Sequence, residues 1–144
     1  FELMNEIKFE QKVKLWKNLR VNLESHPRPF SLLTQFTSTL KTSSRKDSPW
    51  DPKSVIHPWN LIENNSFTEY EIALLTCYTL QLTDRFCLAE VEIHISKDLE
   101  NEQTMYLVYL DKSIVLGYNN EVLTMNDLPE NIISQKTIPM PPLH

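Results

Sequence analysis

The sequence of 144 residues contains a single glycine, Gly117, beside nine prolines. Loops that bind nucleotide phosphates need several glycines, because the backbone must approach the phosphate closely. One glycine cannot supply such a loop, so the sequence excludes P-loop and dinucleotide-binding sites. Its turns must use Asn, Asp, Ser and Pro instead. This predicts stiff connections, which suit a scaffold better than an enzyme that opens and closes.

Cysteines and long apolar runs are also scarce. Cys77 and Cys87 do not make a disulfide framework, and free thiols are typical of a reducing compartment. No apolar run approaches the roughly 18 residues that cross a bilayer, and no secretory signal opens the chain. We therefore expect an intracellular protein, nuclear or cytoplasmic, without a membrane partner. The first residue, Phe1, predicts an excised fragment or a processed chain.

The composition is that of a soluble globular domain, with 41% hydrophobic and 23% charged residues. The length predicts one domain with one core. We expect residues 1–144 to form a single α+β domain. It divides into a helical part over 1–41, a Pro/Trp-containing loop over 42–65, and a helix with an antiparallel sheet and an extended tail over 66–144.

Two segments near the N-terminus show helical periodicity. Residues 6–24 carry apolar side chains every three or four positions, which predicts a helix with one apolar stripe. Apolar and polar residues alternate over residues 19–23, so a strand is the alternative for the end of this segment. Residues 31–41 predict a second, short helix capped by Ser31.

Residues 66–82 carry the clearest local signal. Thr68 and Glu71 are spaced as a capping box, with Phe67 and Ile72 placed as a hydrophobic staple. The helix that follows is apolar on more than one face, and such a helix is buried on most sides. We expect it to be central, covered by the sheet and by either the N-terminal half or a partner.

Residues 86–125 predict an antiparallel meander of three to four strands. Polar and apolar residues alternate in the first strand, and Asn119-Asn120 suits a tight hairpin because Asn accepts a positive φ. The expected elements are strands at 89–95, 105–110, 114–118 and 121–125, one helical turn at 130–135 and an extended tail at 137–144. Helices followed by a meander define an α+β fold.

The residues that could carry chemistry do not form a familiar site. The spacing of Cys77, Cys87 and His94 matches no common zinc pattern, and the acidic loop after the first strand lacks the ligand order of a calcium loop. His94 beside Glu90 or Glu92 is the one acid–base pair to weigh, although a solvated strand face explains the same pattern. We predict no catalytic, metal or cofactor-binding residues and no small-molecule substrate.

Charge divides unevenly along the chain. Residues 1–58 hold ten Lys and Arg against six Asp and Glu, whereas residues 59–144 hold four against thirteen. The acidic half would repel phosphate, so a nucleic acid could bind only the basic first helix. The candidate contacts there are Lys8, Lys12, Lys14, Lys17 and Arg20. An amphipathic surface helix without a nucleic-acid partner fits the same residues.

Two Pro-Trp pairs stand in the least regular segment. Tryptophan anchors dominate many protein interfaces, so these pairs are the candidate partner contacts. The candidates are Pro49, Trp50, Pro58 and Trp59. The competing interpretation is that both rings fold back onto the core. Ser48 precedes Pro49 and follows Arg45 and Lys46, which makes it a possible phosphorylation site that would add negative charge to a basic region.

Together these features favour a non-enzymatic protein–protein interaction domain. We expect a subunit, scaffold or recruiting module of an intracellular multi-protein complex. The alternative is a nucleic-acid-associated protein that contacts phosphates through the basic first helix. An enzyme that uses His94 is the third hypothesis.

Overall fold

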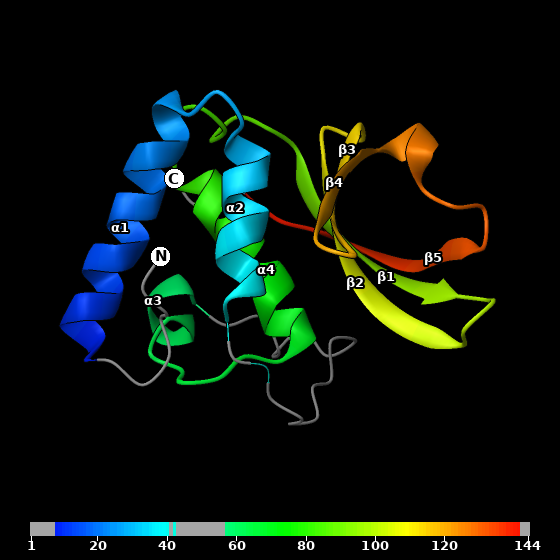
Figure 1. The fold of residues 1–144 in the computed structure, drawn as a ribbon, viewed down its shortest axis with the longest axis horizontal. Coiled ribbons are helices and arrows are strands. Elements are labelled where there is room, and N and C mark those ends of the chain that lie inside the picture. Colours follow the sequence, from blue (N-terminus) through cyan, green and yellow to red (C-terminus); the bar gives the residue numbers. More distant parts are fainter. Residues whose placement is uncertain (1–7, 41, 43–56, 142–144) are drawn as a thin grey trace.

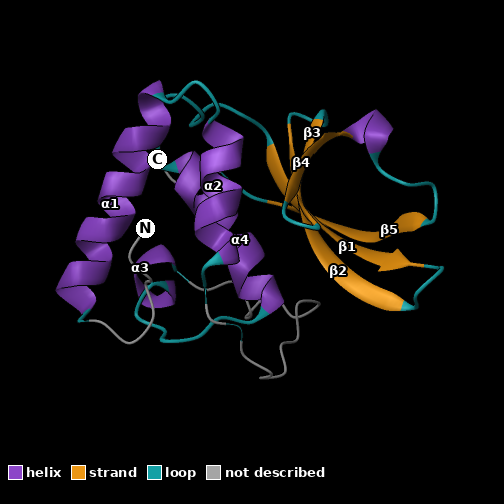
Figure 2. Ribbon diagram, viewed as in Figure 1, coloured by secondary structure: helices purple, strands orange, loops and turns teal. Residues whose placement is uncertain are grey.

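The structure is a computed structural model that describes residues 8–40, 42 and 57–141. Figures 1 and 2 show a group of helices packed beside a curved antiparallel sheet. This arrangement confirms the predicted α+β class, with N-terminal helices and a C-terminal meander. The helices are α1 (Phe9–Ser25), α2 (Pro29–Ser38), α3 (Pro58–Leu61) and α4 (Glu69–Gln81). The strands are β1 (Val91–Asp98), β2 (Gln103–Leu110), β3 (Ile114–Tyr118), β4 (Glu121–Thr124) and β5 (Ile132–Pro139), with a 3-10 turn at Met125–Asp127.

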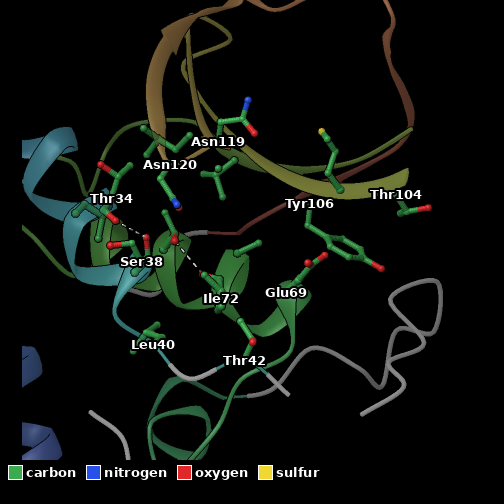
Figure 3. Close-up of a pocket in the computed structure, with 18 of the residues that line it drawn as sticks. Thr34, Ser38, Leu40, Thr42, Glu69, Ile72, Thr104, Tyr106, Asn119 and Asn120 are labelled. Carbon is green, nitrogen blue, oxygen red and sulfur yellow. Dashed lines mark hydrogen bonds between the residues drawn. The ribbon is translucent and has the colours of Figure 1, made fainter. Parts of the chain in front are cut away.

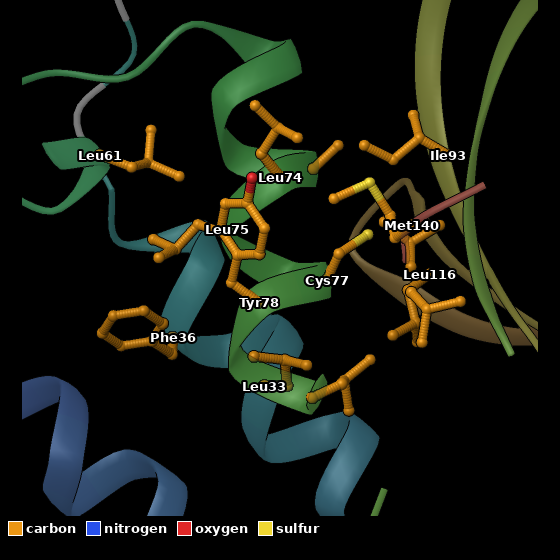
Figure 4. Close-up of a cluster of buried hydrophobic side chains, with 14 of the residues drawn as sticks. Leu33, Phe36, Leu61, Leu74, Leu75, Cys77, Tyr78, Ile93, Leu116 and Met140 are labelled. Carbon is orange, nitrogen blue, oxygen red and sulfur yellow. The ribbon is translucent and has the colours of Figure 1, made fainter. Parts of the chain in front are cut away.

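The helix α4 packs against the other helices and also against β1 and β2 of the sheet (Figure 1). It begins with the predicted capping box: Thr68 Oγ1 accepts the N–H of Glu71, and Glu71 Oε1 accepts the N–H of Thr68. Nearly all of its side chains are buried. Figure 4 shows side chains of α2, α3, β1 and β3 meeting those of α4. The chain itself therefore covers most of this helix.

The first two helices differ from the prediction at their ends. The strand alternative for the end of the first segment is wrong, because α1 continues to Ser25. Trp16, Leu19 and Leu23 bury the apolar stripe of this helix. The second helix begins at Pro29, two residues before Ser31. Proline fits the first turn because its missing N–H would have no partner there.

Five strands form one antiparallel sheet in the order β4-β3-β2-β1-β5. Side chains alternate between the two faces of the sheet. One face, with Ile93 and Val108, packs on the helices, whereas Leu107 and Tyr109 join a second cluster on the other face. The helical turn predicted at 130–135 is wrong, because β5 begins at Ile132 and pairs with β1.

The tight turns of the sheet use positive φ without glycine. Asn119 and Asn120, between β3 and β4, have φ values of 50° and 57°, which confirms the prediction for this pair. Asp111 and Lys112, between β2 and β3, adopt 52° and 53°. Paired positive φ values match the right-handed twist of the strands that they join.

Gly117 interrupts β3 just before the Asn119-Asn120 turn. Its φ is +104°, and a Cβ at this position would lie 3.2 Å from the backbone oxygen of Tyr106. The register between β3 and β4 shifts at the same point. The only glycine of the chain therefore stands where a side chain would meet both backbone strain and a close neighbouring strand.

Gly117→Ala is expected to lower the free energy of unfolding by about 1–3 kcal/mol, because the backbone conformation is strained for any residue with a Cβ. Urea denaturation measures this change. Asn120→Gly is the matched control, since its positive φ suits glycine, and we expect a change below about 0.5 kcal/mol. An unchanged midpoint for Gly117→Ala would contradict the strained conformation.

Candidate functional site

A pocket of about 350 Å³ opens between the helical layer and the sheet. Figure 3 shows its walls: α2 and the start of α4 on one side, β2 and the turn between β3 and β4 on the other. Apolar residues such as Ile72, Ala73 and Val108 contribute to its lining. Hydroxyl and amide side chains, including Thr34 and Asn120, make up much of the remainder.

Among the described residues that line this pocket, one is charged: Glu69, whose carboxylate is exposed. The part of the lining that the structure describes holds no Cys, His, Lys or Arg. A hydroxyl nucleophile needs a base within hydrogen-bond reach, and an imidazole is the usual one. The described part of the lining offers apolar, hydroxyl and amide groups and the carboxylate of Glu69.

The sequence did not reveal this pocket, because four separate segments build it. The only sign of its polar lining in the sequence was the pair of threonines, Thr34 and Thr37, within a segment predicted to be a helix. Both hydroxyls bond to backbone oxygens three residues earlier, at Ser31 and Thr34. This local bonding makes threonine tolerable in α2 and leaves the side chains beside the pocket.

The predicted interface residues fall into two groups. Pro49, Trp50 and the possible phosphorylation site Ser48 lie outside the described residues. Pro58 is buried, which argues against it as a surface contact, whereas Trp59 remains 40% exposed. Its ring meets the buried Trp16 edge to face at 5.3 Å. Trp59 therefore fits both interpretations of the sequence: its ring packs on the core, and part of it remains exposed for a partner contact.

The basic residues of α1 do not form one surface. Lys12 is buried, and its ammonium group donates to three oxygens of the 63–65 segment. Arg20 is half-buried, with its guanidinium 4.8 Å from the centre of the Trp16 ring. Lys8, Lys14 and Lys17 are exposed. Two of the five predicted phosphate contacts thus have internal partners, and Lys12 is inaccessible to a phosphate.

His94 lies on the face of the sheet that points away from the helices, outside the pocket lining. Its Nε2 is 3.1 Å from Glu92 Oε1, and its Nδ1 is 2.9 Å from Ser134 Oγ. The ring stacks on Tyr109 at 3.7 Å. Glu90 points elsewhere and lies 3.8 Å from Lys112. The structure therefore joins His94 to Glu92 and adds Ser134, which the sequence did not indicate.

The two cysteines have different surroundings. Cys77 is fully buried within α4, and this burial raises the pKa of its thiol. Cys87 is partly exposed after α4, with its sulfur 3.4 Å from the backbone oxygen of Asp84. Among the described residues, no group of three or more His, Cys, Asp or Glu side chains is placed to hold a metal ion.

A thiol reagent is expected to distinguish these cysteines. At pH 8 the folded chain should react quickly at Cys87 alone, because a thiolate at Cys77 would be buried and without water. The second equivalent should appear only after denaturation. Ellman's reagent counts the thiols, and Cys87→Ser should abolish the fast phase. Rapid loss of both thiols in the folded chain would contradict the burial of Cys77.

Alkaline pH is expected to destabilise the fold through α4. Burial raises the pKa of Tyr78 to about 12 and also raises that of Cys77, so the folded chain holds protons that the unfolded chain releases. Stability then falls above about pH 8.5 through Cys77 and above about pH 10 through Tyr78, by up to about 1.4 kcal/mol per pH unit for each group. Urea titrations from pH 7 to 10 measure the slope, which Cys77→Ala should reduce.

The comparisons with known proteins identify a fold but no family. No protein-family model and no curated protein matches the sequence. A solved structure, calcium-bound LapG of Legionella pneumophila, is similar at a TM-score of 0.66. The match covers 92% of this chain and 84% of that chain, with 14% sequence identity. At this identity the likeness establishes a shared fold alone.

Proposed function

We propose that this chain is a non-enzymatic protein-binding domain that recruits a partner within an intracellular multi-protein complex. The observation that carries the proposal is the pocket between the helices and the sheet. It offers apolar, hydroxyl and amide groups, and Glu69 is the one charged side chain among its described residues. A concave site of this size with a few polar groups is typical of ligand recognition.

Trp59 provides a second contact for the same partner or assembly. It belongs to the residue type most enriched among interface hot spots, and 40% of its surface is exposed. The calcium named for the Legionella protein is not part of the proposal, because the described residues contain no suitable cluster of carboxylates.

Pocket-dependent binding is tested with two matched threonine variants. Thr104 and Thr137 are both exposed strand residues, but only Thr104 lines the pocket. Tagged wild type, Thr104→Trp and Thr137→Trp are used to recover partners from cells that make the protein, and the partners are then purified and titrated. We expect wild type and Thr137→Trp to bind alike and Thr104→Trp to lose most of the affinity. Equal binding by all three would remove the pocket from the proposal.

The non-enzymatic part has a direct test at His94. A serine, an imidazole and a carboxylate in hydrogen-bonded order are the arrangement that activates a serine nucleophile. If Ser134, His94 and Glu92 worked in this way, a fluorophosphonate probe would label Ser134 covalently. We expect no labelling above that of Ser134→Ala. Stoichiometric labelling that disappears in His94→Asn would overturn the proposal in favour of a hydrolase.

A further inference from the structure

We propose that the pocket takes an extended peptide, which adds as a strand to the open edge of β2 and places a Lys or Arg side chain against Glu69. This inference rests on the proposed function and specifies the chemistry of the partner. The pocket would recognise a polypeptide by its backbone hydrogen-bonding groups and a basic side chain by its charge.

The open edge follows from the strand pairings. β3 pairs with β2 only from Val108 to Leu110, whereas β1 pairs with β2 from Gln103 onward. Among the described residues, Gln103–Met105 therefore has a strand partner on one side only. The pairing of β3 with β2 ends at Leu116, and the next residue is Gly117 with its φ of +104°.

The hydrogen-bonding direction places a donor and an acceptor at this edge. The backbone N–H of Asp111 donates to the backbone oxygen of Glu90 at 2.7 Å. By the same register, the backbone N–H and C=O groups of the odd-numbered residues of β2 point toward β1. The direction alternates along an antiparallel strand. The backbone N–H and C=O of Thr104 consequently point away from β1, toward the side on which a further strand would add. Such an edge recognises polypeptide backbone and gives affinity without fixing the sequence.

Charge supplies the sequence preference. Glu69 is the single charged residue among the described residues of the lining, and the chain from residue 59 onward holds thirteen acidic against four basic residues. A basic peptide is attracted to this surface, whereas an acidic one is repelled. Side chains of an added strand alternate between its faces, so every second residue can point toward the α4 side of the pocket, where Ile72 and Ala73 lie.

Selection from a display library of random nonapeptides tests the charge preference. We expect wild type to enrich peptides with Lys or Arg at a fixed position, and Thr104→Trp to enrich none of them. Glu69→Gln should weaken a selected peptide about fivefold, the upper range for a partly exposed ion pair. Glu69→Lys, used in a second selection, should enrich Asp or Glu at that position instead. Enriched peptides without a basic preference, or an unchanged preference in Glu69→Lys, would overturn the role of Glu69.

Backbone pairing is tested on the best selected peptide, with the protein unchanged. Each peptide N–H is replaced in turn by N-methyl. Added-strand binding predicts losses of about tenfold at alternate positions and little change between them, because only every second N–H faces β2. Losses without a period of two would overturn the strand geometry. Selected peptides that need the pocket but show neither the basic preference nor the period of two would contradict this inference and leave the proposed function standing. Natural partners that bind wild type and Thr104→Trp equally would contradict the proposed function itself.

Discussion

Trp16→Ala is expected to lower the free energy of unfolding by about 3–5 kcal/mol, the usual cost of removing a large buried aromatic side chain. The ring is fully buried at the junction of α1, α3 and α4. Its Nε1 donates to Thr79 Oγ1 at 2.8 Å, and Trp59 packs against its face or edge at 5.3 Å. One substitution therefore removes apolar burial, a hydrogen bond and an aromatic contact together.

Two further variants separate these contributions. Trp16→Phe keeps a ring but loses the bond to Thr79, and we expect a loss of about 1–3 kcal/mol. Trp59→Ala removes a partly exposed ring and should cost less than Trp16→Ala. Chemical denaturation followed by circular dichroism measures all three. If Trp59→Ala were as damaging as Trp16→Ala, Trp59 would be a core residue and its place as an interface contact would fall.

Features with a local cause were predictable from the sequence. The capping box at Thr68 and Glu71 depends on hydrogen bonds within one turn, and the Asn119-Asn120 turn depends on a conformation that Asn tolerates. The apolar pattern after Thr68 also predicted a buried helix. These local signals were enough to give the α+β class and the order of its main elements.

Features that depend on distant partners were not predictable in the same way. Residues 130–135 suggested a helical turn, but Ile132 begins a strand that pairs with β1, with one irregularity between Ile95 and Ser96. Strand formation depends on such context more than helix formation does. The pocket combines α2, α4, β2 and the turn after β3, and no single segment reveals that combination.

Lys12 was predicted as a phosphate contact, but in the structure it is an internal hydrogen-bond donor. Its position among other basic residues predicted a phosphate contact, because a sequence shows charge and not accessibility. In the structure the aliphatic stem is buried, and the ammonium group donates to Glu63 O at 2.9 Å, Asn64 O at 2.7 Å and Asn65 Oδ1 at 2.9 Å. Burial lowers the pKa of this group, and nearby Glu63 opposes that shift. Lys12 thus ties α1 to the segment before α4.

Lys12→Met is expected to lower the free energy of unfolding by about 2–3 kcal/mol, because it keeps the apolar stem but leaves three oxygens without their charged donor. The exposed Lys14, two residues along α1, is the matched control, and Lys14→Met should change stability by less than about 0.5 kcal/mol. Urea denaturation measures both variants. Equal effects would mean that the Lys12 ammonium group is solvated. A labelled oligonucleotide bound by wild type and lost in Lys12→Met, with stability unchanged, would return Lys12 to the phosphate contacts that the sequence predicted.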